Sequence, residues 1–219
     1  MKRTYASGAR WYDFISGEPL YRQGRTVGVE MLALRSGDTV LDLGCGTGLN
    51  FPLLVDAVGP HGSVVGLDRS TDMLEVAAKR VDRHGWSNVE LVHADATLFE
   101  PGDLRDRAGR SLPSVDALIA TYTMSIMADP HAAWHNARSV LRPGGRACIV
   151  DMQRPTGWAR AFTPLALAAC ALGGSDIDAH PWRFAEQDGH EVSRRSLRGG
   201  HIQVVAATFE TFIEHPARG

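Results

Sequence analysis

Three glycines in one short loop are the first residues whose spacing suggests chemistry. Gly44, Gly46 and Gly48 recur at every second position, directly after the apolar residues 39–43. Because glycine has no Cβ, the backbone can turn tightly there and approach a ligand closely. The alternative for this loop alone is a sharp turn between a strand and a helix that binds nothing.

Three carboxylates accompany this loop. Asp42 precedes Gly44 by two residues, Asp68 follows Gly48 by twenty, and Asp95 comes after a third apolar segment. If these segments are parallel strands, their carboxyl ends share the sheet edge at which α/β proteins bind ligands, and a carboxylate there can accept both hydroxyls of a ribose. Any one of these aspartates could equally cap a helix. The three together with the loop predict a nucleotide-like ligand.

The glycine spacing discriminates between nucleotides. A dinucleotide loop is Gly-x-Gly-x-x-Gly after an apolar residue, and it receives a pyrophosphate on backbone amides. Here the pattern is Gly-x-Gly-x-Gly with Asp42 in front. A carboxylate would repel a pyrophosphate but could pair with the ammonium group of an amino acid. The predicted ligand is therefore adenosine that carries a methionine.

The elements that would position these residues alternate along the chain. Apolar runs and helical spacing predict strands at 39–43, 63–67, 89–93, 115–120 and 146–150, with helices at 71–84 and 131–141. This alternation predicts a doubly wound, mostly parallel sheet of the α/β class. The segment 141–145 (LRPGG) is expected to end a helix and turn the chain into the next strand. Later we expect a short helix at 163–172 and an antiparallel hairpin of 192–197 and 201–209.

The composition fits one folded, soluble domain: 219 residues, 44% of them hydrophobic, carry a formal net charge of -2. The protein has no net positive charge that would attract the phosphate backbone of DNA or RNA, so nucleic acid is not an expected partner. Three widely separated cysteines fit a reducing cytosol better than a disulfide framework or a zinc site, and no metal is expected. The longest apolar run, residues 165–172, is too short to span a bilayer. We therefore expect a cytoplasmic protein without a transmembrane segment, and peripheral membrane contact stays open.

Four motifs carry a resemblance to a family. LDLGCGTG, VVGLD, HADA and LRPGGR resemble the class I S-adenosylmethionine-dependent methyltransferases over roughly residues 35–151. The stretches WYDFISGEPLYRQGR and GPHGSVVGLDRSTDML are similar to small bacterial enzymes that methylate quinone precursors or phospholipid amino head groups. The resemblance implies a seven-stranded sheet whose last strand is antiparallel. The fourth strand ends in ATYTM and lacks the Asn/Asp-Pro-Pro-aromatic motif of nucleic-acid amino-methylating enzymes.

The resemblance also implies which residues hold the cofactor. The methionine part would lie against the glycine loop, Asp68 would bind ribose, and Asp95-Ala96 would meet the amino edge of adenine. The full implied set is Tyr12, Tyr21, Arg25, Asp42, Gly44, Cys45, Gly46, Gly48, Asn50, Asp68, Arg69, Met73, Asp95, Ala96, Thr121 and Tyr122.

The acceptor would lie between the two ends of a single domain. We expect residues 1–34 to form an N-terminal lid, 35–151 the cofactor-binding core, and 152–219 an acceptor-side helix and hairpin. The candidate acceptor residues are Met124, Ser125, Trp158, His180 and His201. Apolar side chains are more often core than pocket, and aromatic residues of the lid could simply anchor an amphipathic helix. No catalytic residue is assigned, because a methyl transfer needs a base only when the nucleophile carries a proton.

The sequence thus favours an enzyme that moves a methyl group from S-adenosylmethionine to a small-molecule or lipid-like acceptor and releases S-adenosylhomocysteine. One alternative is an NAD-dependent oxidoreductase, which the glycine spacing and Asp42 oppose. Another is a non-catalytic S-adenosylmethionine-binding protein, which the lack of an assigned base leaves open. The identity of the acceptor, the methylated atom and the oligomeric state stay undetermined.

Overall fold

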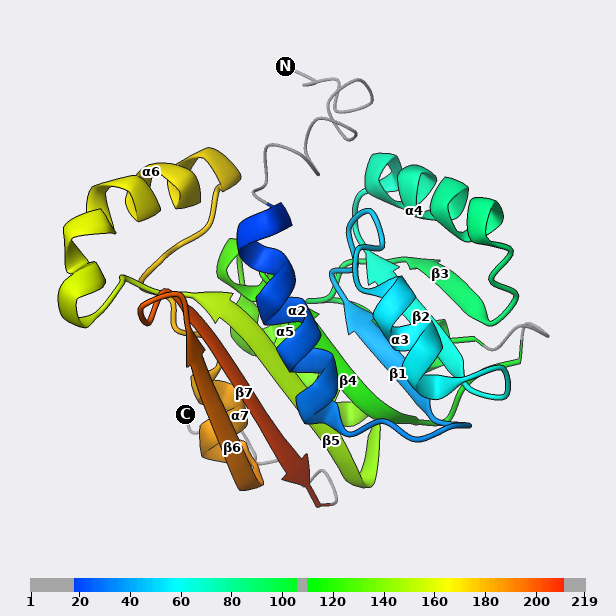
Figure 1. Cartoon of the computed structure of the whole chain (residues 1–219). Coiled ribbons are helices and arrows are strands. Elements are labelled where there is room, and N and C mark those ends of the chain that lie inside the picture. The colour runs from blue at the N-terminus through cyan, green and yellow to red at the C-terminus, as the bar shows by residue number, and fades with distance from the viewer. Residues whose placement is uncertain (1–17, 106–109, 211–219) are drawn as a thin grey trace.

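A seven-stranded sheet forms the centre of the molecule (Figure 1). The computed structural model describes residues 18–105 and 110–210. The strands, in the sheet order β3-β2-β1-β4-β5-β7-β6, are β1 (Thr39–Leu43), β2 (Ser63–Asp68), β3 (Val89–His93), β4 (Val115–Thr121), β5 (Leu141–Met152), β6 (His190–Leu197) and β7 (Ile202–Phe209). The first five pair in parallel, and β7 lies antiparallel to both β5 and β6. The expected α/β fold with an antiparallel C-terminal hairpin is confirmed.

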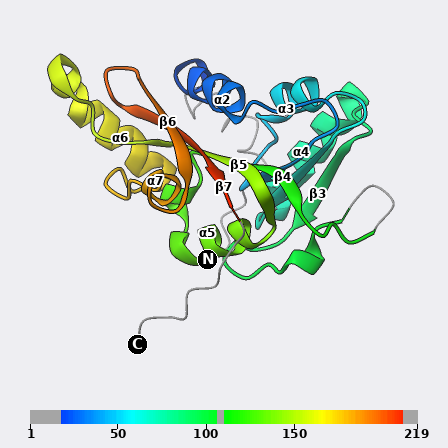
Figure 2. The same cartoon turned by 90° about the horizontal axis from the view of Figure 1, so that it is seen from below.

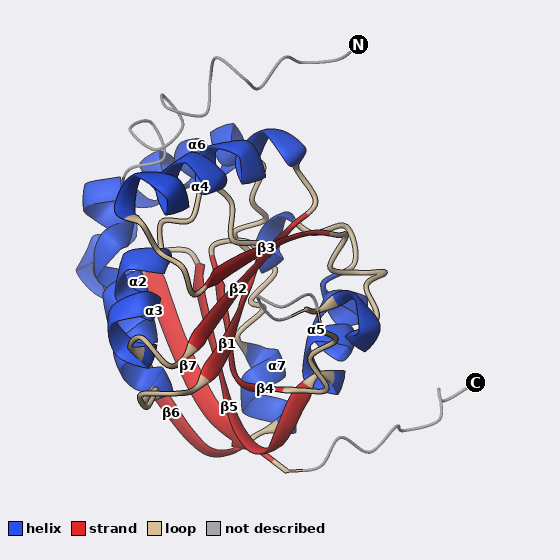
Figure 3. Ribbon diagram, turned by 90° about the vertical axis from the view of Figure 1, so that its right-hand side faces the viewer, coloured by secondary structure: helices blue, strands red, loops and turns tan. Residues whose placement is uncertain are grey.

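Helices cover both faces of this sheet (Figures 2 and 3). They are α2 (Glu18–Leu32), α3 (Phe51–Val58), α4 (Thr71–His84), α5 (Pro130–Ser139), α6 (Thr163–Gly173) and α7 (Arg183–Asp188), with short 3-10 turns η1 (Pro101–Asp103), η2 (Met124–Ile126) and η3 (Gly157–Phe162). Buried residues of α2, α3 and α4 form one hydrophobic layer with the sheet, and those of α5 and α7 form the other.

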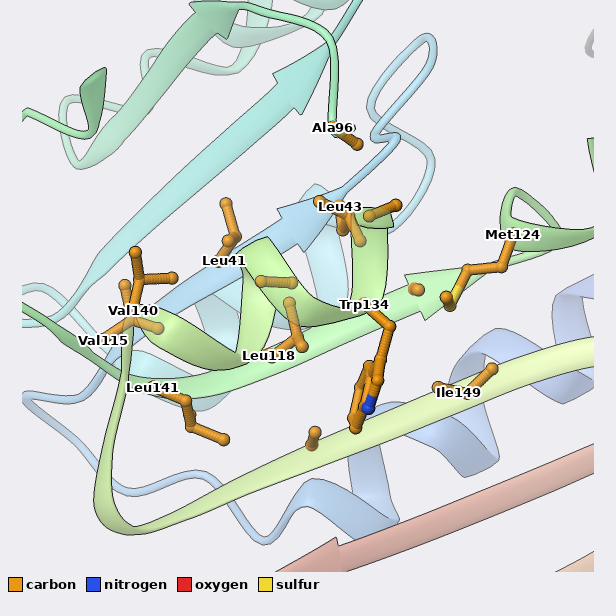
Figure 4. Packing of buried hydrophobic residues seen from close by; sticks show 14 of the residues in the cluster. Leu41, Leu43, Ala96, Val115, Leu118, Met124, Trp134, Val140, Leu141 and Ile149 are labelled. Atoms are coloured by element: carbon orange, nitrogen blue, oxygen red, sulfur yellow. The ribbon is translucent and has the colours of Figure 1, made fainter. Parts of the chain in front are cut away.

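The short apolar runs become strands because both faces of the sheet are covered. In β1, Val40 points into the layer of α2 and α3, whereas Leu41 and Leu43 point into the layer of α5. Figure 4 shows the second layer, in which Trp134 of α5 lies near Ile149 of β5. A strand that is buried on both sides needs apolar residues at successive positions, so the continuous runs predicted parallel strands correctly.

Local capping explains the bounds of α4, which agree with the predicted 71–84. The Ser70 hydroxyl accepts a hydrogen bond from the backbone N–H of Met73, and Gly85 ends the helix in the left-handed conformation with φ +66°. A serine at the N-cap satisfies an otherwise unpaired amide, and a glycine after the last turn adopts positive φ at little cost.

The structure corrects the expectation for residues 141–145. They are not a turn outside the strand, because β5 already begins at Leu141, five residues before its predicted start. Leu141 pairs with Val115, and the register then shifts so that Arg146 pairs with Ala117. The intervening residues form an irregularity within the pairing of β4 and β5.

The part of the expected lid that the structure describes, residues 18–34, contains helix α2, which covers one face of the sheet. Helix α2 packs on β4, β5 and β7, with Val27 and Leu32 buried. Residues 1–17, including Tyr12, lie outside the described residues. None of the helices in the described part of the chain is long and apolar enough to cross a membrane. The division into lid, core and acceptor part stays a prediction.

Candidate active site

The loop between β1 and α3 is shaped by its three glycines. Gly44, Gly46 and Gly48 have φ of +67°, +55° and +77°. A Cβ at Gly44 would lie 2.1 Å from Oγ1 of Thr123, and one at Gly48 would lie 2.5 Å from the ring of Phe51. A Cβ at Gly46 would meet nothing within 4 Å. Two glycines therefore allow close packing inside the protein, and Gly46 faces open space that a ligand can occupy.

Asp68, at the end of β2, holds this loop in place. One of its carboxylate oxygens accepts a hydrogen bond from the backbone N–H of Gly46 at 2.8 Å, and the other accepts from the N–H of Ser70 at 2.8 Å. A carboxylate oxygen has two lone pairs, so both oxygens can accept one more hydrogen bond. The two hydroxyls of a ribose fit this requirement.

Asp42 is a fully buried carboxyl group with one oxygen unpaired. Its Oδ1 accepts a hydrogen bond from Nδ2 of Asn50 at 2.9 Å, and Asn50 also donates to Oγ1 of Thr121 at 3.0 Å. The Oδ2 atom is buried without a hydrogen-bond partner. Burial raises the pKa of Asp42 to about 7, although the Asn50 hydrogen bond and the charge of Arg25 lower it. A buried oxygen without a partner is costly, and the ammonium group of a ligand would satisfy it.

Helix α2 is attached to the end of β4 through aromatic residues. The Tyr122 hydroxyl donates to the backbone oxygen of Tyr21 at 2.9 Å, and the two rings lie 5.0 Å apart. The buried guanidinium of Arg25 lies 5.4 Å from the centre of the Tyr122 ring. Tyr122 has φ +56°, a strained conformation for a non-glycine residue of the kind that concentrates at functional sites. Three residues of the predicted cofactor set thus meet beside Thr121.

The remaining predicted cofactor residues lie at the ends of β2 and β3. Asp95 accepts hydrogen bonds from the N–H and the hydroxyl of Thr97, which lower its pKa. Ala96 is buried, and its carbonyl accepts from Asn136 of α5. Arg69 and Met73 follow Asp68 along the chain. Cys45 is buried in the loop, and burial raises its pKa well above the ordinary value, so this thiol stays protonated.

Tyr21 contacts His201 as well as Tyr122. The Tyr21 hydroxyl lies 3.5 Å from Nε2 of His201, and Nδ1 of His201 lies 2.6 Å from the carbonyl oxygen of Gln153. A carbonyl oxygen only accepts, so Nδ1 carries the proton, and in the neutral ring the Nε2 lone pair faces Tyr21. Burial and the nearby Cys170 and Asp151 raise the pKa of Tyr21 to about 12, so its hydroxyl stays protonated.

Asp151, at the end of β5, is a site residue that the sequence predictions missed. It is fully buried and accepts hydrogen bonds from the N–H and the hydroxyl of Ser125 at 3.1 and 2.8 Å. Burial raises the pKa of Asp151 to about 6. Its signal was present, because it follows a predicted strand as Asp68 and Asp95 do.

The structure brings together only some of the predicted acceptor residues. His201 contacts Tyr21 and Ser125 donates to Asp151, whereas Met124 is buried in the core beside α5. Trp158 is 82% exposed in η3, and His180 contacts Trp182, with ring centres 5.1 Å apart. Among residues 18–105 and 110–210, no three His, Cys, Asp or Glu side chains gather in a way that could hold a metal ion.

Comparisons with known proteins show which family this chain resembles. The methyltransferase domain family matches residues 34–175. The 2-phytyl-1,4-naphtoquinone methyltransferase of Synechococcus elongatus is 35% identical over 140 residues, which cover 62% of this chain and 55% of that protein. The arsenite methyltransferase of Halobacterium salinarum is 29% identical over 148 residues, which cover 67% of this chain and 36% of that protein.

A solved structure shares the fold. The SAM-dependent methyltransferase from Aquifex aeolicus has a TM-score of 0.65 to this chain at 22% identity, and the alignment covers 93% of this chain and 98% of that one. The match to the curated relatives is shorter, since this chain spans between 33% and 55% of the length of the first of them.

Proposed function

Because the chain belongs to the methyltransferase domain family, we propose that it transfers a methyl group from S-adenosylmethionine to a small, apolar acceptor and releases S-adenosylhomocysteine. The observation that carries this proposal is the combination of two features around the loop after β1. Gly46 faces open space, and Asp42 has a buried carboxylate oxygen without a hydrogen-bond partner.

The described residues fit each part of this cofactor. Asp42, Asn50 and the glycine loop would hold the amino acid end, with the buried Arg25 near Asp42. The carboxylate of Asp68 would accept the ribose hydroxyls, and Arg69, Met73 and the Asp95-Ala96 segment would hold the adenine. Thr121 and Tyr122, after β4, would complete the site. Bound there, S-adenosylmethionine supplies an electrophilic methyl group on a sulfonium.

The protein's main contribution to the reaction is alignment of the acceptor and exclusion of water. Tyr21 and His201 add a route for a proton when the nucleophile carries one. The Tyr21 oxygen would take up the proton that the acceptor loses, and Tyr21 would pass its own proton to Nε2 of His201, 3.5 Å away. The carbonyl of Gln153 keeps the proton on Nδ1, so Nε2 is ready to accept.

An apolar acceptor fits the surroundings of Tyr21. Met152, Ala166, Cys170 and Ile177 form a small hydrophobic cluster against Tyr21 and Tyr122. The Synechococcus relative is named for methylation of a phytyl naphtoquinone, which is a lipid-like ring compound. We therefore propose a lipid-like or aromatic small molecule, not a nucleic acid, as the acceptor. The three cysteines are free and buried in the structure, which supports a place in the cytoplasm.

Calorimetry with S-adenosylmethionine tests the cofactor assignment. We expect binding by the wild type and a loss of affinity of about 30-fold or more in Asp68→Asn, because hydrogen bonds to a charged group contribute about 2 kcal/mol. Asp56→Asn, on the exposed side of α3, is the matched control and should bind like the wild type. Absence of binding by the wild type, or unchanged affinity in Asp68→Asn, would contradict the proposal.

Two further measurements separate the alternatives. A protein that binds NADH and not S-adenosylmethionine would be an oxidoreductase. Incubation with labelled S-adenosylmethionine and separated lipid and polar extracts should label the lipid fraction. Label in neither fraction, with cofactor binding intact, would favour a non-catalytic binding protein.

A further inference from the structure

Large exposed apolar side chains concentrate in one stretch of the described chain. Trp158 is 82% exposed, Phe162 54% and Leu165 70%, and Leu167 follows at 36%. They lie in η3 and the first turns of α6, within ten residues of sequence. Single exposed apolar residues are ordinary on a soluble protein, but a contiguous group of this size indicates a binding surface.

Helix α6 is apolar on both of its faces. Ala166 and Cys170, one turn apart, pack inward with Met152 and Ile177, whereas Leu165 and Leu167 point outward. No charged residue occurs between Ala161 and Ser175. A helix that is hydrophobic all round requires an apolar environment on its outer side as well. With eleven residues it is too short to span a bilayer, but it can lie in the interface of one.

Positive charges border this surface. Arg160 is exposed within η3 itself. Arg198, also exposed, lies in the turn before β7, which is joined to η3 because the Thr156 N–H donates to the Gly199 carbonyl at 2.8 Å. Asp178, which follows α6, is paired with Arg154 at 2.6 Å, and Asp176 is exposed beside it. Arg160, within the apolar group itself, adds attraction to anionic head groups.

We propose that η3 and the outer face of α6 insert into the interface of a membrane that contains anionic lipids. Figure 1 shows α6 beyond the arrowhead of β5, the strand that ends at Met152, one residue after Asp151. The inner face of the same helix belongs to the hydrophobic cluster that packs against Tyr21. A docked helix would thus open the acceptor side of the site toward the lipid, and the acceptor would enter from the membrane. This inference rests on the proposed function for the identity of the acceptor, but not for the binding itself.

Flotation of the full chain with lipid vesicles tests the proposal. Wild-type protein should float with vesicles of phosphatidylcholine and phosphatidylglycerol, and much less with phosphatidylcholine alone. The double variant Trp158→Ser/Phe162→Ser should lower vesicle binding at least about tenfold, and Arg160→Gln about fivefold, with a similar loss at high salt. Leu98→Ser, which removes a side chain that is 77% exposed outside this surface, is the matched control and should float like the wild type.

Several outcomes would overturn the inference. A wild type that never floats, or a double variant that floats as well as the wild type, excludes insertion through this surface. A wild type that does not float but is a dimer, and becomes a monomer in the double variant, would show that a second copy covers it. Calorimetry with S-adenosylmethionine should give the same affinity for the double variant and the wild type. Failure of cofactor binding in both would contradict the proposed function and leave the vesicle result standing.

Discussion

At the carboxyl ends of β2 and β3 the aspartates are held by nearby backbone amides, whereas at the ends of β4 and β5 the site is built from distant parts of the chain. Asp68 is bound by Gly46 and Ser70, and Asp95 by Thr97. Tyr21, in contrast, meets a partner 180 residues away, His201. The cofactor side therefore depends on local loops with a fixed pattern, and the acceptor side depends on how α2, α6 and the hairpin pack.

The largest expected effect is a loss of turnover without a loss of cofactor affinity, in variants of the acceptor side. Tyr21→Phe and His201→Asn should each lower turnover by about 10²-fold or more if the acceptor loses a proton on methylation, because a positioned acid–base group contributes about that much. Their affinity for S-adenosylmethionine should change little. Turnover is measured with the labelled extract fraction, affinity by calorimetry, and His61→Gln on an exposed loop is the control.

A purely structural role for this pair would appear differently. Both variants would then lose stability and turnover together. If Tyr21 and His201 instead carry the proton, both variants should keep the unfolding temperature of the wild type in a thermal scan while turnover falls.

The next effect compares two glycines of the same loop. Gly46→Ala adds a methyl group to open space, so it should cost only about 1 kcal/mol of stability for the positive φ, yet weaken S-adenosylmethionine binding about tenfold or more by filling the cofactor space. Gly48→Ala should be the less stable protein, because its Cβ would lie 2.5 Å from Phe51. Thermal unfolding and calorimetry on both variants measure these effects. Wild-type affinity in Gly46→Ala would place the cofactor elsewhere.

A smaller effect concerns pH on the cofactor side. Burial raises the pKa of Asp42 to about 7, so between about pH 4 and pH 7 the folded protein keeps a proton that the unfolded chain releases. This contribution to stability is complete below pH 4 and is lost as the pH rises through 7. A cationic cofactor favours the ionised carboxylate, so its affinity should rise with pH, by up to about tenfold per pH unit below 7.

Asp42→Asn is the variant that isolates this behaviour. Calorimetry between about pH 5 and pH 7.5 should show a much flatter affinity profile than in the wild type. Its unfolding free energy should also vary less with pH, while Asp151, whose pKa burial raises to about 6, keeps its own contribution. A wild-type affinity that does not change over this range would contradict the role of Asp42.

The smallest effect on stability and cofactor affinity is expected for an exposed ion pair outside the cofactor side and the acceptor side. Arg154 and Asp178 form a two-fold hydrogen-bonded pair at 2.7 and 2.6 Å, with half of each side chain exposed. Exposed ion pairs contribute little because water screens them. Asp178→Asn should leave cofactor affinity unchanged and shift the unfolding temperature hardly at all in a thermal scan. A large shift would mean that this pair anchors α6 to the acceptor side.

The contrast between the two sides also explains what the sequence could predict. The strands and α4 were predictable because apolar runs, Ser70 and Gly85 act on their immediate neighbours. The glycine spacing marked the loop after β1, but not the distant Thr123 against which Gly44 packs. The start of β5 was missed because Leu141 joins the strand only through its partner Val115, in a register that no local pattern encodes. Asp151 follows a predicted strand as Asp68 does, but it was missed because no local pattern indicates its hydrogen bonds with Ser125, 26 residues earlier.

Strand β6 lies at one free edge of the sheet, and its composition has a consequence for self-association. It runs exposed along almost its whole length, carries Arg194 and Arg195, and its pairing with β7 is interrupted between His190 and Ser193, where Glu191 has φ +50°. Charged side chains and an irregular backbone prevent the unpaired amides of an edge strand from joining the edge of another molecule. The hairpin that completes the acceptor side is thereby also protected against edge-to-edge aggregation.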